Sequence, residues 1–244
     1  MKLSNILLHE TGAEMTASLR APEFIFPTLA LPCVFYAIFG VLLSRGGNAA
    51  TYLLATYGVF AVMGPAIFGF GVGVATEREK GWLSLKRVAP APAASYIGAK
   101  LITTLTFAAL ALVPVYLIAG FLGDVALPRA QWLTLFGTHL LAALPFSLIG
   151  LLLGFRFASG AAVAVSNIVF LGFALLGGLW IPISMFPGVM QTIAQAIPSF
   201  HLAEISLSVI DTNTPRNVGL HVGVILAMTA VLALLAAAAW RRQP

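Results

Sequence analysis

Few side chains in this 244-residue chain have the types that a catalytic site needs. Ser159 and His221 are a candidate nucleophile and base, because a serine hydroxyl becomes reactive when a histidine takes its proton. The two groups would have to lie about 3 Å apart for that transfer. Whether they meet depends on the segments that carry them.

A pair of glutamates is the second candidate. Glu77 and Glu79 have the residue type of a metalloprotease site, but residues separated by one position point to different faces of a helix. Arg78 and Lys80 flank them, which favours a solvated charge cluster. We therefore expect no catalysis from this pair.

Three histidines could bind a metal ion by residue type alone: His139, His201 and His221. No cysteine or carboxylate accompanies them at the spacing of metal ligands. We expect single histidines near a membrane interface, each hydrogen-bonded or hydrated, and no metal site.

The composition is that of a membrane protein. The chain is 60% hydrophobic and 9% charged, and its mean hydropathy is +0.99, whereas globular domains average roughly 45–50% apolar and 25% charged residues. About 20 apolar residues cross a bilayer, and six uncharged runs are long enough: 24–43, 52–75, 101–122, 132–155, 160–181 and 218–240. The predicted fold class is an all-α polytopic membrane protein with six transmembrane helices in a single domain, 1–244.

The basic residues predict the orientation, because loops rich in Lys and Arg stay in the cytoplasm. With the N-terminus inside, ten of the thirteen fall on the inner side: Lys2, Arg20, Arg78, Lys80, Lys86, Arg87, Lys100, Arg156, Arg241 and Arg242. The outer loops hold the other three: Arg45, Arg129 and Arg216. Both termini are predicted inside, and the net charge of +5 indicates topology rather than a nucleic-acid partner.

This topology argues against chemistry in the chain itself. Ser159 would lie at the inner end of one span and His221 near the outer end of another, so we expect no hydrolase. The eight acidic residues all fall outside the predicted spans: Glu10, Glu14, Glu23, Glu77, Glu79, Asp124, Glu204 and Asp211. An ion-coupled carrier would place ionisable groups inside them. The chain also has no Gly-Lys-Ser/Thr loop for a nucleotide, so active transport would need energy from another chain.

The N-terminal residues 1–22 lack the pattern of a cleaved signal and are predicted to remain as an interfacial helix. Leu3, Leu7, Glu10, Glu14 and Ala17 recur at helical spacing, so one face can lie at the headgroup boundary. A frayed cytoplasmic tail is the alternative.

The longest inner loop, 76–92, is a charged segment between the second and third spans. Trp82, Leu85 and Ala89 share a stripe on a helical wheel, and Pro90 and Pro92 end the helix. Such a short amphipathic helix could dock into a protein groove or rest on anionic lipid.

A proline-bracketed outer segment, 183–200, is the second distinctive feature. Val189, Ile193 and Ile197 recur every four residues in a run too short to cross the bilayer. It predicts an outer amphipathic or re-entrant helix, whose irregular backbone needs protein or water around it. Glycine pairs four residues apart, 69 with 73 and 150 with 154, predict close helix contacts.

Together these segments resemble a known family, the membrane subunits of type-2 ABC exporters. "EREKGWLSLKRVAPAPAASYIGAKL" (77–101) is similar to the family's Glu-Arg-Glu-x-Gly-x-Leu-x-x-Leu-x-Val-x-Pro loop before a Gly-Lys pair. "GGLWIPISMFPGVMQTIAQAIPSFH" (177–201) is similar to its Gly-Gly and proline pattern around the fifth span. The resemblance covers nearly the whole chain.

The resemblance implies that the charged segment is a coupling helix seated on a separate ABC ATPase subunit, present in two copies that bind ATP and Mg²⁺. The implied coupling residues are Glu77, Arg78, Glu79, Lys80, Gly81, Trp82, Leu83 and Leu85. It also implies an outer gate at Pro182, Pro187, Val189, Ile193, Ile197 and Pro198. Two permease chains, as a homodimer or heterodimer in a bacterial inner membrane, would enclose the pathway.

The second and fifth spans are expected to line that pathway at the dimer interface. Candidate lining residues are Phe60, Phe68, Phe70, Asn167, Phe170 and Phe173. The 17 Phe residues favour an amphiphilic drug or lipid-like cargo moved outward. A glycan exporter of the same family is the rival, since aromatic rings also stack on sugars; an intramembrane enzyme and a non-transporting scaffold subunit are alternatives from other classes.

The predicted topology is testable by cysteine labelling after replacement of the native Cys33. Cysteines at positions 20, 87 and 243 should react only with a reagent applied from the cytoplasm, and those at 47, 129 and 213 only from outside, because ten of thirteen basic residues fall on the inner side. Labelling of position 213 from the cytoplasm would contradict the six-span arrangement.

Overall fold

The structure is a computed structural model that describes residues 3–20, 26–88 and 93–242. These residues form helices and connecting turns, with no strand among them. The elements in chain order are α1 (Leu3–Leu19), η1 (Phe26–Ala30), α3 (Leu31–Phe35), η2 (Tyr36–Leu43), α4 (Asn48–Glu79), α5 (Trp82–Val88), α6 (Ala93–Phe121), α7 (Arg129–Arg156), α8 (Ser159–Leu176), η3 (Ile183–Met185), α9 (Gly188–Ala194), α10 (Pro198–Ile210) and α11 (Val218–Arg241).

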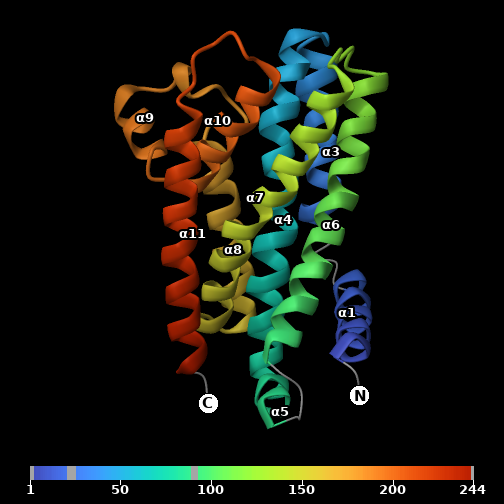
Figure 1. Ribbon diagram of the computed structural model, residues 1–244, viewed down its shortest axis with the longest axis vertical. Helices are drawn as coiled ribbons and strands as arrows, with labels where there is room; N and C mark the ends of the chain where they lie inside the picture. Colours follow the sequence, from blue (N-terminus) through green and yellow to red (C-terminus); the bar gives the residue numbers. More distant parts are fainter. Residues whose placement is uncertain (1–2, 21–25, 89–92, 243–244) are drawn as a thin grey trace.

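The long helices stand roughly parallel to the long axis of the molecule. Both ends of the described chain and α5 lie at one end, and α9 and α10 lie toward the other (Figure 1). This arrangement agrees with the prediction that the two termini share a side, whereas the side that faces the cytoplasm stays a prediction.

Five helices are long and apolar enough to cross a membrane within the described residues: 48–79, 95–121, 129–156, 159–176 and 218–241. They correspond to the second through sixth predicted spans. The bent pair α9 and α10, with 88° between its two helices, would make a sixth crossing if it counts as one span. The all-helical fold class is confirmed, and the count of spans is five or six.

The first predicted span, 24–43, is described only in part, and its described part is helical. Its first residues lie outside the described part, and the remainder is a shorter apolar helix, 28–43, with π-helical turns on both sides of α3. Pro27 and Pro32 explain the irregular turns, because proline has no N–H for the helical ladder.

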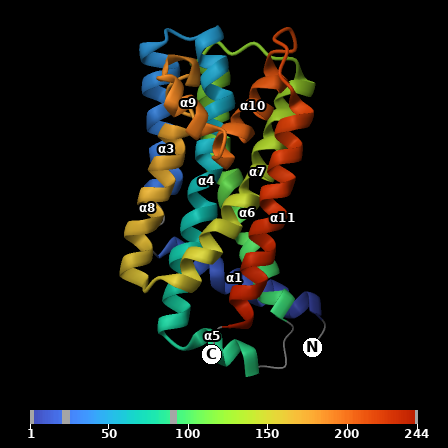
Figure 2. The same cartoon turned by 90° about the vertical axis from the view of Figure 1, so that its left-hand side faces the viewer.

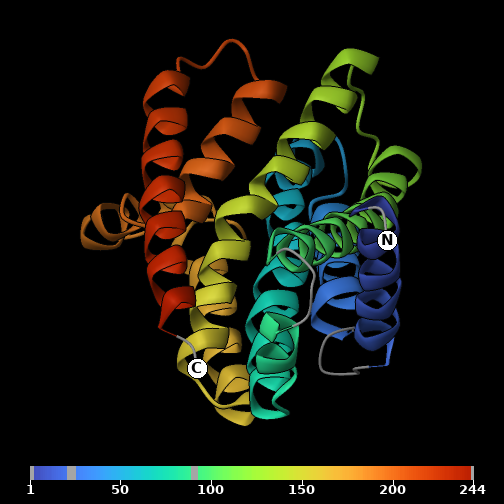
Figure 3. The same cartoon turned by 60° about the horizontal axis from the view of Figure 1, so that its bottom comes forward.

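Helix α4 is the centre of the bundle. Within its most apolar stretch, 83% of the residues are buried, against 11% in α11. It packs against α6, α7, α8 and α10, while α11 and α1 lie at opposite edges (Figures 1 and 3). A helix enclosed on all sides must be apolar around its whole circumference. Accordingly, the sequence of α4 has no charged residue between positions 52 and 75.

Small residues bring α4 and α7 into backbone contact. A methyl group added at Gly150 would lie 2.8 Å from the carbonyl oxygens of Ala66 and Ile67, and one at Gly154 would lie 2.8 Å from that of Gly71. The close approach predicted for Gly150 and Gly154 is therefore confirmed. Its partner on α4 is Gly71, midway between the predicted pair at 69 and 73.

The fifth predicted span, 160–181, ends earlier than expected. Helix α8 stops at Leu176, and the chain turns through Gly178, whose φ of +73° favours glycine. The Leu179 amide donates to Ala174 and the Gly178 amide to Leu175, which is the hydrogen-bond pattern of a glycine-ended helix. Residues 177–181 are consequently a turn.

The outer segment 183–200 also differs from the prediction in where its helices begin and end. It contains η3 and the short helix α9, but Pro198 begins a helix, α10, that the sequence reading did not anticipate. Ser199, Leu202 and Ser206 are buried on α10, which packs against α4, α7 and α11. Proline is well suited to the first turn of a helix, because the N–H that it lacks would have no helical partner there.

The predicted N-terminal helix is present as α1, and it runs across the lower part of the bundle instead of along it (Figure 2). Leu8 and Leu19 are exposed, and α1 packs on α6. This orientation is that of an interfacial helix, although membrane contact stays a prediction.

The α4–α7 contact gives a matched test on one helix. Gly150→Ala should destabilise the protein by about 1–3 kcal/mol, because the added methyl meets backbone atoms that cannot rotate away. This corresponds to a loss of several °C in Tm, at about 2–4 °C per kcal/mol. Gly137→Ala on the same helix meets nothing within 4 Å and should leave Tm unchanged or raise it. Thermal unfolding in detergent, followed by size-exclusion chromatography, measures both; equal shifts would contradict the backbone contact.

Candidate functional site at the end of α4

The candidate site is the junction between α4 and α5, at the end of the molecule where both termini lie. Helix α4 ends at Glu79, Lys80 follows as its cap, and α5 begins at Trp82. Gly81 has φ +72°, a conformation that side chains disfavour, so a glycine allows the sharp turn between the two helices. Residues 77–79, here called the ERE triplet, form the last turn of α4.

Glu77 points into the protein. Its carboxylate accepts a hydrogen bond from the Tyr96 hydroxyl at 2.6 Å and forms an ion pair of 2.9 Å with Lys100. Lys100 also pairs with Glu14 of α1 at 2.8 Å. Burial of Glu77 and Lys100, whose exposures are 9% and 2%, corrects the expectation of a solvated cluster at this glutamate. The physical reason is that a partner ammonium offsets the cost of burying the carboxylate.

The cluster contains two carboxyl groups and one ammonium group. Burial raises the pKa of the Glu14 carboxyl to about 7, because desolvation disfavours its charged form and the neighbouring Glu77 adds repulsion, while Lys100 acts in the opposite direction. The three residues tie α1, α4 and α6 together.

Arg78 and Glu79 hold the next two helices. Arg78 donates from its two terminal nitrogens to the carbonyl oxygens of Phe155 and Phe157, the latter at 2.7 Å. These carbonyls belong to the C-terminus of α7, where a cation is favoured. Glu79 accepts hydrogen bonds from the side chain and backbone of Ser159, the first residue of α8. The ERE triplet therefore contacts α6, α7 and α8, and reaches α1 through Lys100.

Helix α5 is anchored on one side and open on the other. Leu83 is buried in an apolar cluster with Phe70, Val74 and Phe155. Trp82 and Leu85 are 49% and 65% exposed. An exposed aromatic and aliphatic pair next to a firmly held turn is a surface suited to a protein partner.

The described residues include most of the predicted coupling segment. Ala89, Pro90 and Pro92 lie outside them. Lys80 extends over the Trp82 ring, with 5.1 Å from its Nζ to the ring centroid.

The predicted pathway residues occupy two different environments. Phe60, Phe68, Phe70 and Phe170 are almost fully buried, and Phe170 lies 4.7 Å from Phe60 and 5.6 Å from Phe68 between ring centroids. They fill the core of this chain, which is the ordinary role of aromatic side chains between helices. The remaining candidates on α8 are partly exposed: Asn167 and Phe173.

Asn167 bonds within its own helix. Its amide donates to the Val163 carbonyl at 2.9 Å. The hydrogen bond that this amide needs in hydrocarbon is therefore supplied by the preceding turn of α8.

The predicted outer gate residues do not form one packed face in the single chain. Val189 and Ile193 are 74% and 46% exposed, whereas Ile197 and Pro198 are buried. The reason is that α9 ends at Ala194, so Ile197 lies beyond it. Pro182 and Pro187 immediately precede η3 and α9.

The histidines have partners other than Ser159, which hydrogen-bonds Glu79. His139 bonds the Tyr116 hydroxyl and the Ala55 carbonyl, each at 2.9 Å. His201 contacts His221 at 2.8 Å between their Nδ1 atoms, a pairing that sequence reasoning missed because α10 was not expected. Across the described ranges, no three His, Cys, Asp or Glu side chains gather as a metal site would require.

These features define a polytopic helical membrane protein with a short exposed helix at one end. The family described as "ABC-2 family transporter protein" matches residues 44–238. The chain is also 30% identical over 216 residues to YvfS of Bacillus subtilis (strain 168), which carries the name of a transport permease; the match covers 86% of this chain and 88% of that protein.

The chain belongs to the ABC-2 transporter family and is an integral protein of a bacterial membrane. Permeases of this family normally work with an ATPase partner. The predicted resemblance is confirmed.

Removing Lys100 from its buried cluster should destabilise the protein more than removing Arg216 from its partly exposed ion pairs. Lys100→Met should cost about 3–5 kcal/mol, because it leaves Glu14 and Glu77 buried without their cation. At about 2–4 °C per kcal/mol, Tm falls by on the order of 10 °C. The loss should be smaller at pH 5 than at pH 8, because protonation neutralises carboxyl groups whose buried charge is unfavourable.

Arg216→Met is the matched control. Arg216 also bridges two carboxylates, Glu204 at 3.1 Å and Asp211 at 3.4 Å, but these groups are partly exposed. Its loss should cost about 0–1 kcal/mol. Thermal unfolding at both pH values measures the two variants, and equal losses would mean that the buried cluster does not hold the fold.

Proposed function

We propose that this chain is the permease subunit of an ATP-driven exporter, powered by a separate ATPase chain that binds ATP and Mg²⁺. The proposal rests on α5, which exposes an apolar surface and is attached to several helices of the bundle. Its Trp82 and Leu85 are exposed, while the ERE triplet behind it contacts several membrane helices. The family membership makes an ATPase the natural partner for this surface.

The contacts of the triplet supply a route for motion. A partner that pushes α5 displaces the end of α4, and the ion pair of Glu77 with Lys100 carries that displacement into α6. Arg78 carries it to the C-terminus of α7, and Glu79 to the beginning of α8. Because helices are rigid over these lengths, a movement at one end reaches the opposite side of the membrane.

A second permease chain would complete the pathway, in a homodimer or a heterodimer that binds two ATPase copies. The partly exposed Phe173 and Asn167 on α8 suit a surface at that interface better than the buried core aromatics do. Exposed Val189 and Ile193 on α9 could then pack as an outer gate against the second chain. An amphiphilic drug or lipid-like molecule is the cargo class, because the exposed side of α8 is dominated by apolar side chains, including Ile168 and Leu171.

The coupling role of α5 predicts a specific loss. Trp82→Ala combined with Leu85→Ala should reduce ATP hydrolysis of the assembled complex to the rate of the free ATPase, because the docking surface is removed. The double variant should still insert and keep its Tm within a few °C, since both side chains are largely exposed. The ATPase that co-purifies with the chain, reconstituted in proteoliposomes, provides the measurement.

Phe121→Ala combined with Leu122→Ala is the matched control. These residues are 80% and 63% exposed, and they lie where α6 ends, at the opposite end of that helix from its start near α5 (Figure 1). Their variant should hydrolyse ATP as the parent does. Normal hydrolysis by the Trp82 and Leu85 variant would instead place α5 on the lipid surface.

A further inference from the structure

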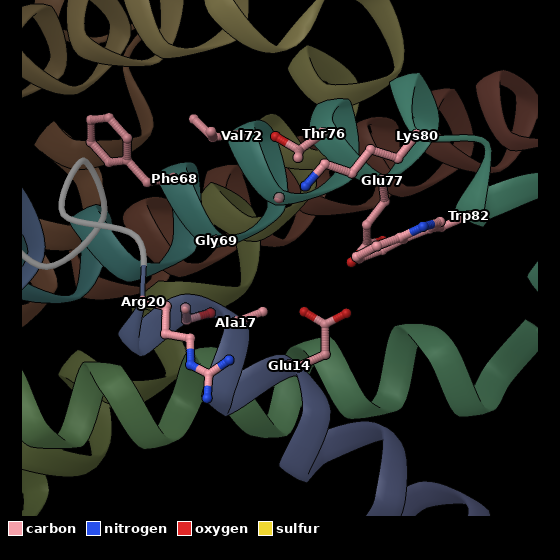
Figure 4. Close-up of a pocket in the computed structure, with 12 residues that line it drawn as sticks. Glu14, Ala17, Arg20, Phe68, Gly69, Val72, Thr76, Glu77, Lys80 and Trp82 are labelled. Atoms are coloured by element: carbon pink, nitrogen blue, oxygen red, sulfur yellow. The ribbon is translucent and has the colours of Figure 1, made fainter.

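A cavity of about 470 Å³ lies between α1 and the last turns of α4. Ala17 and Arg20 border it from α1, Gly69 and Thr76 from α4, and Trp82 closes one side (Figure 4). This volume falls within the range of roughly 300–1,000 Å³ found for small-molecule sites. Neither the coupling surface of α5 nor the ion-pair cluster accounts for an open space of this size.

The cavity has an apolar wall and a charged lining. Phe68, Gly69 and Val72 make the apolar wall on α4, whereas Arg20, which follows α1, and Lys80, at the end of α4, are the cationic residues of the lining. In Figure 4 the Lys80 side chain extends back along α4, so its ammonium group reaches over the cavity. A ligand that satisfies both parts must itself be amphiphilic.

The charges decide the sign of the ligand. Glu14 and Glu77 also line the cavity, but both carboxyl groups are engaged by Lys100 at 2.8 and 2.9 Å. Arg20 and Lys80 form no ion pair with a carboxylate in the described part of the chain; Lys80 instead lies over the Trp82 ring. The charges left to bind a ligand are therefore positive.

The position of α1 indicates where such a ligand would come from. This helix crosses the bundle near the end that carries α5 (Figure 2), and it exposes Leu8 and Leu19, as a helix at the headgroup boundary does. Basic pockets between membrane helices at this depth bind anionic lipid headgroups. We propose that the cavity binds an anionic phospholipid from the adjacent leaflet, with its phosphate between Arg20 and Lys80 and an acyl chain against Phe68 and Val72.

A lipid bound in this cavity would stabilise the contact between α1 and α4. The lipid joins α1 to the end of α4, beside the contact that Glu14 and Lys100 already make. It thereby stabilises the same helix end that α5 extends, independently of any transported cargo.

The test uses the full chain, delipidated in a neutral detergent and titrated with phosphatidylglycerol or phosphatidylcholine of identical acyl chains. Native mass spectrometry counts retained lipids, and thermal unfolding reports stabilisation. We expect phosphatidylglycerol to be retained and to raise Tm, with phosphatidylcholine binding at least about tenfold more weakly. Equal retention and stabilisation by the two lipids would overturn the proposal. Inorganic phosphate alone should not raise Tm; if it matches phosphatidylglycerol, the site binds a simple anion.

Two variants locate the site. Arg20→Gln with Lys80→Gln should lower the affinity for phosphatidylglycerol at least about tenfold, whereas Arg241→Gln with Arg242→Gln, which removes two exposed cations from the end of α11, should not. Val72→Trp fills the apolar wall without changing charge and should also abolish the retained lipid. Size-exclusion profiles verify folding of each variant. Unchanged lipid binding in the Arg20 and Lys80 variant, or in Val72→Trp, would place the lipid elsewhere.

Discussion

The ion pairs of Lys100 with Glu14 and Glu77 are the interaction on which the rest of this end of the molecule depends. A charge buried in an apolar bundle is stable only when its partners are held in place, so the cluster constrains three helices at once. It determines where α1 crosses the bundle and where α4 ends relative to α6. The turn at Gly81, the exposed side of α5 and the cavity beside Trp82 all lie next to this cluster.

A second constraint acts higher in the bundle, where α4 and α7 meet through Gly71, Gly150 and Gly154. The close backbone contact leaves little freedom for the two helices to move apart. At their lower ends Arg78 adds a polar connection between the same helices. Helix α4 is therefore held along much of its length, and a force on α5 would move a connected group of helices rather than one loop.

The sequence by itself determined the composition class, the long apolar helices and the location of the short amphipathic helix. Spans of uncharged residues can be read directly, because hydrocarbon demands that every residue of a crossing be compatible with lipid or protein. The spacing of the glutamates at 77 and 79 placed them on different helix faces, but it did not reveal that Glu77 is buried. The ABC-2 family was also readable from residues 77–101 and 177–201, whose order of charges, glycines and prolines is local to the chain.

Only the tertiary structure decided which charges are buried and what they contact. Lys100, Glu14 and Glu77 are separated by 23 to 86 positions, and no local pattern reveals that one ammonium serves both carboxyl groups. The same limit applies to the core aromatics, since a phenylalanine in a span has the same sequence signal whether it lines a pathway or packs against Phe170. Helix α10 was not anticipated, because its packing against α4, α7 and α11 cannot be read from the segment alone.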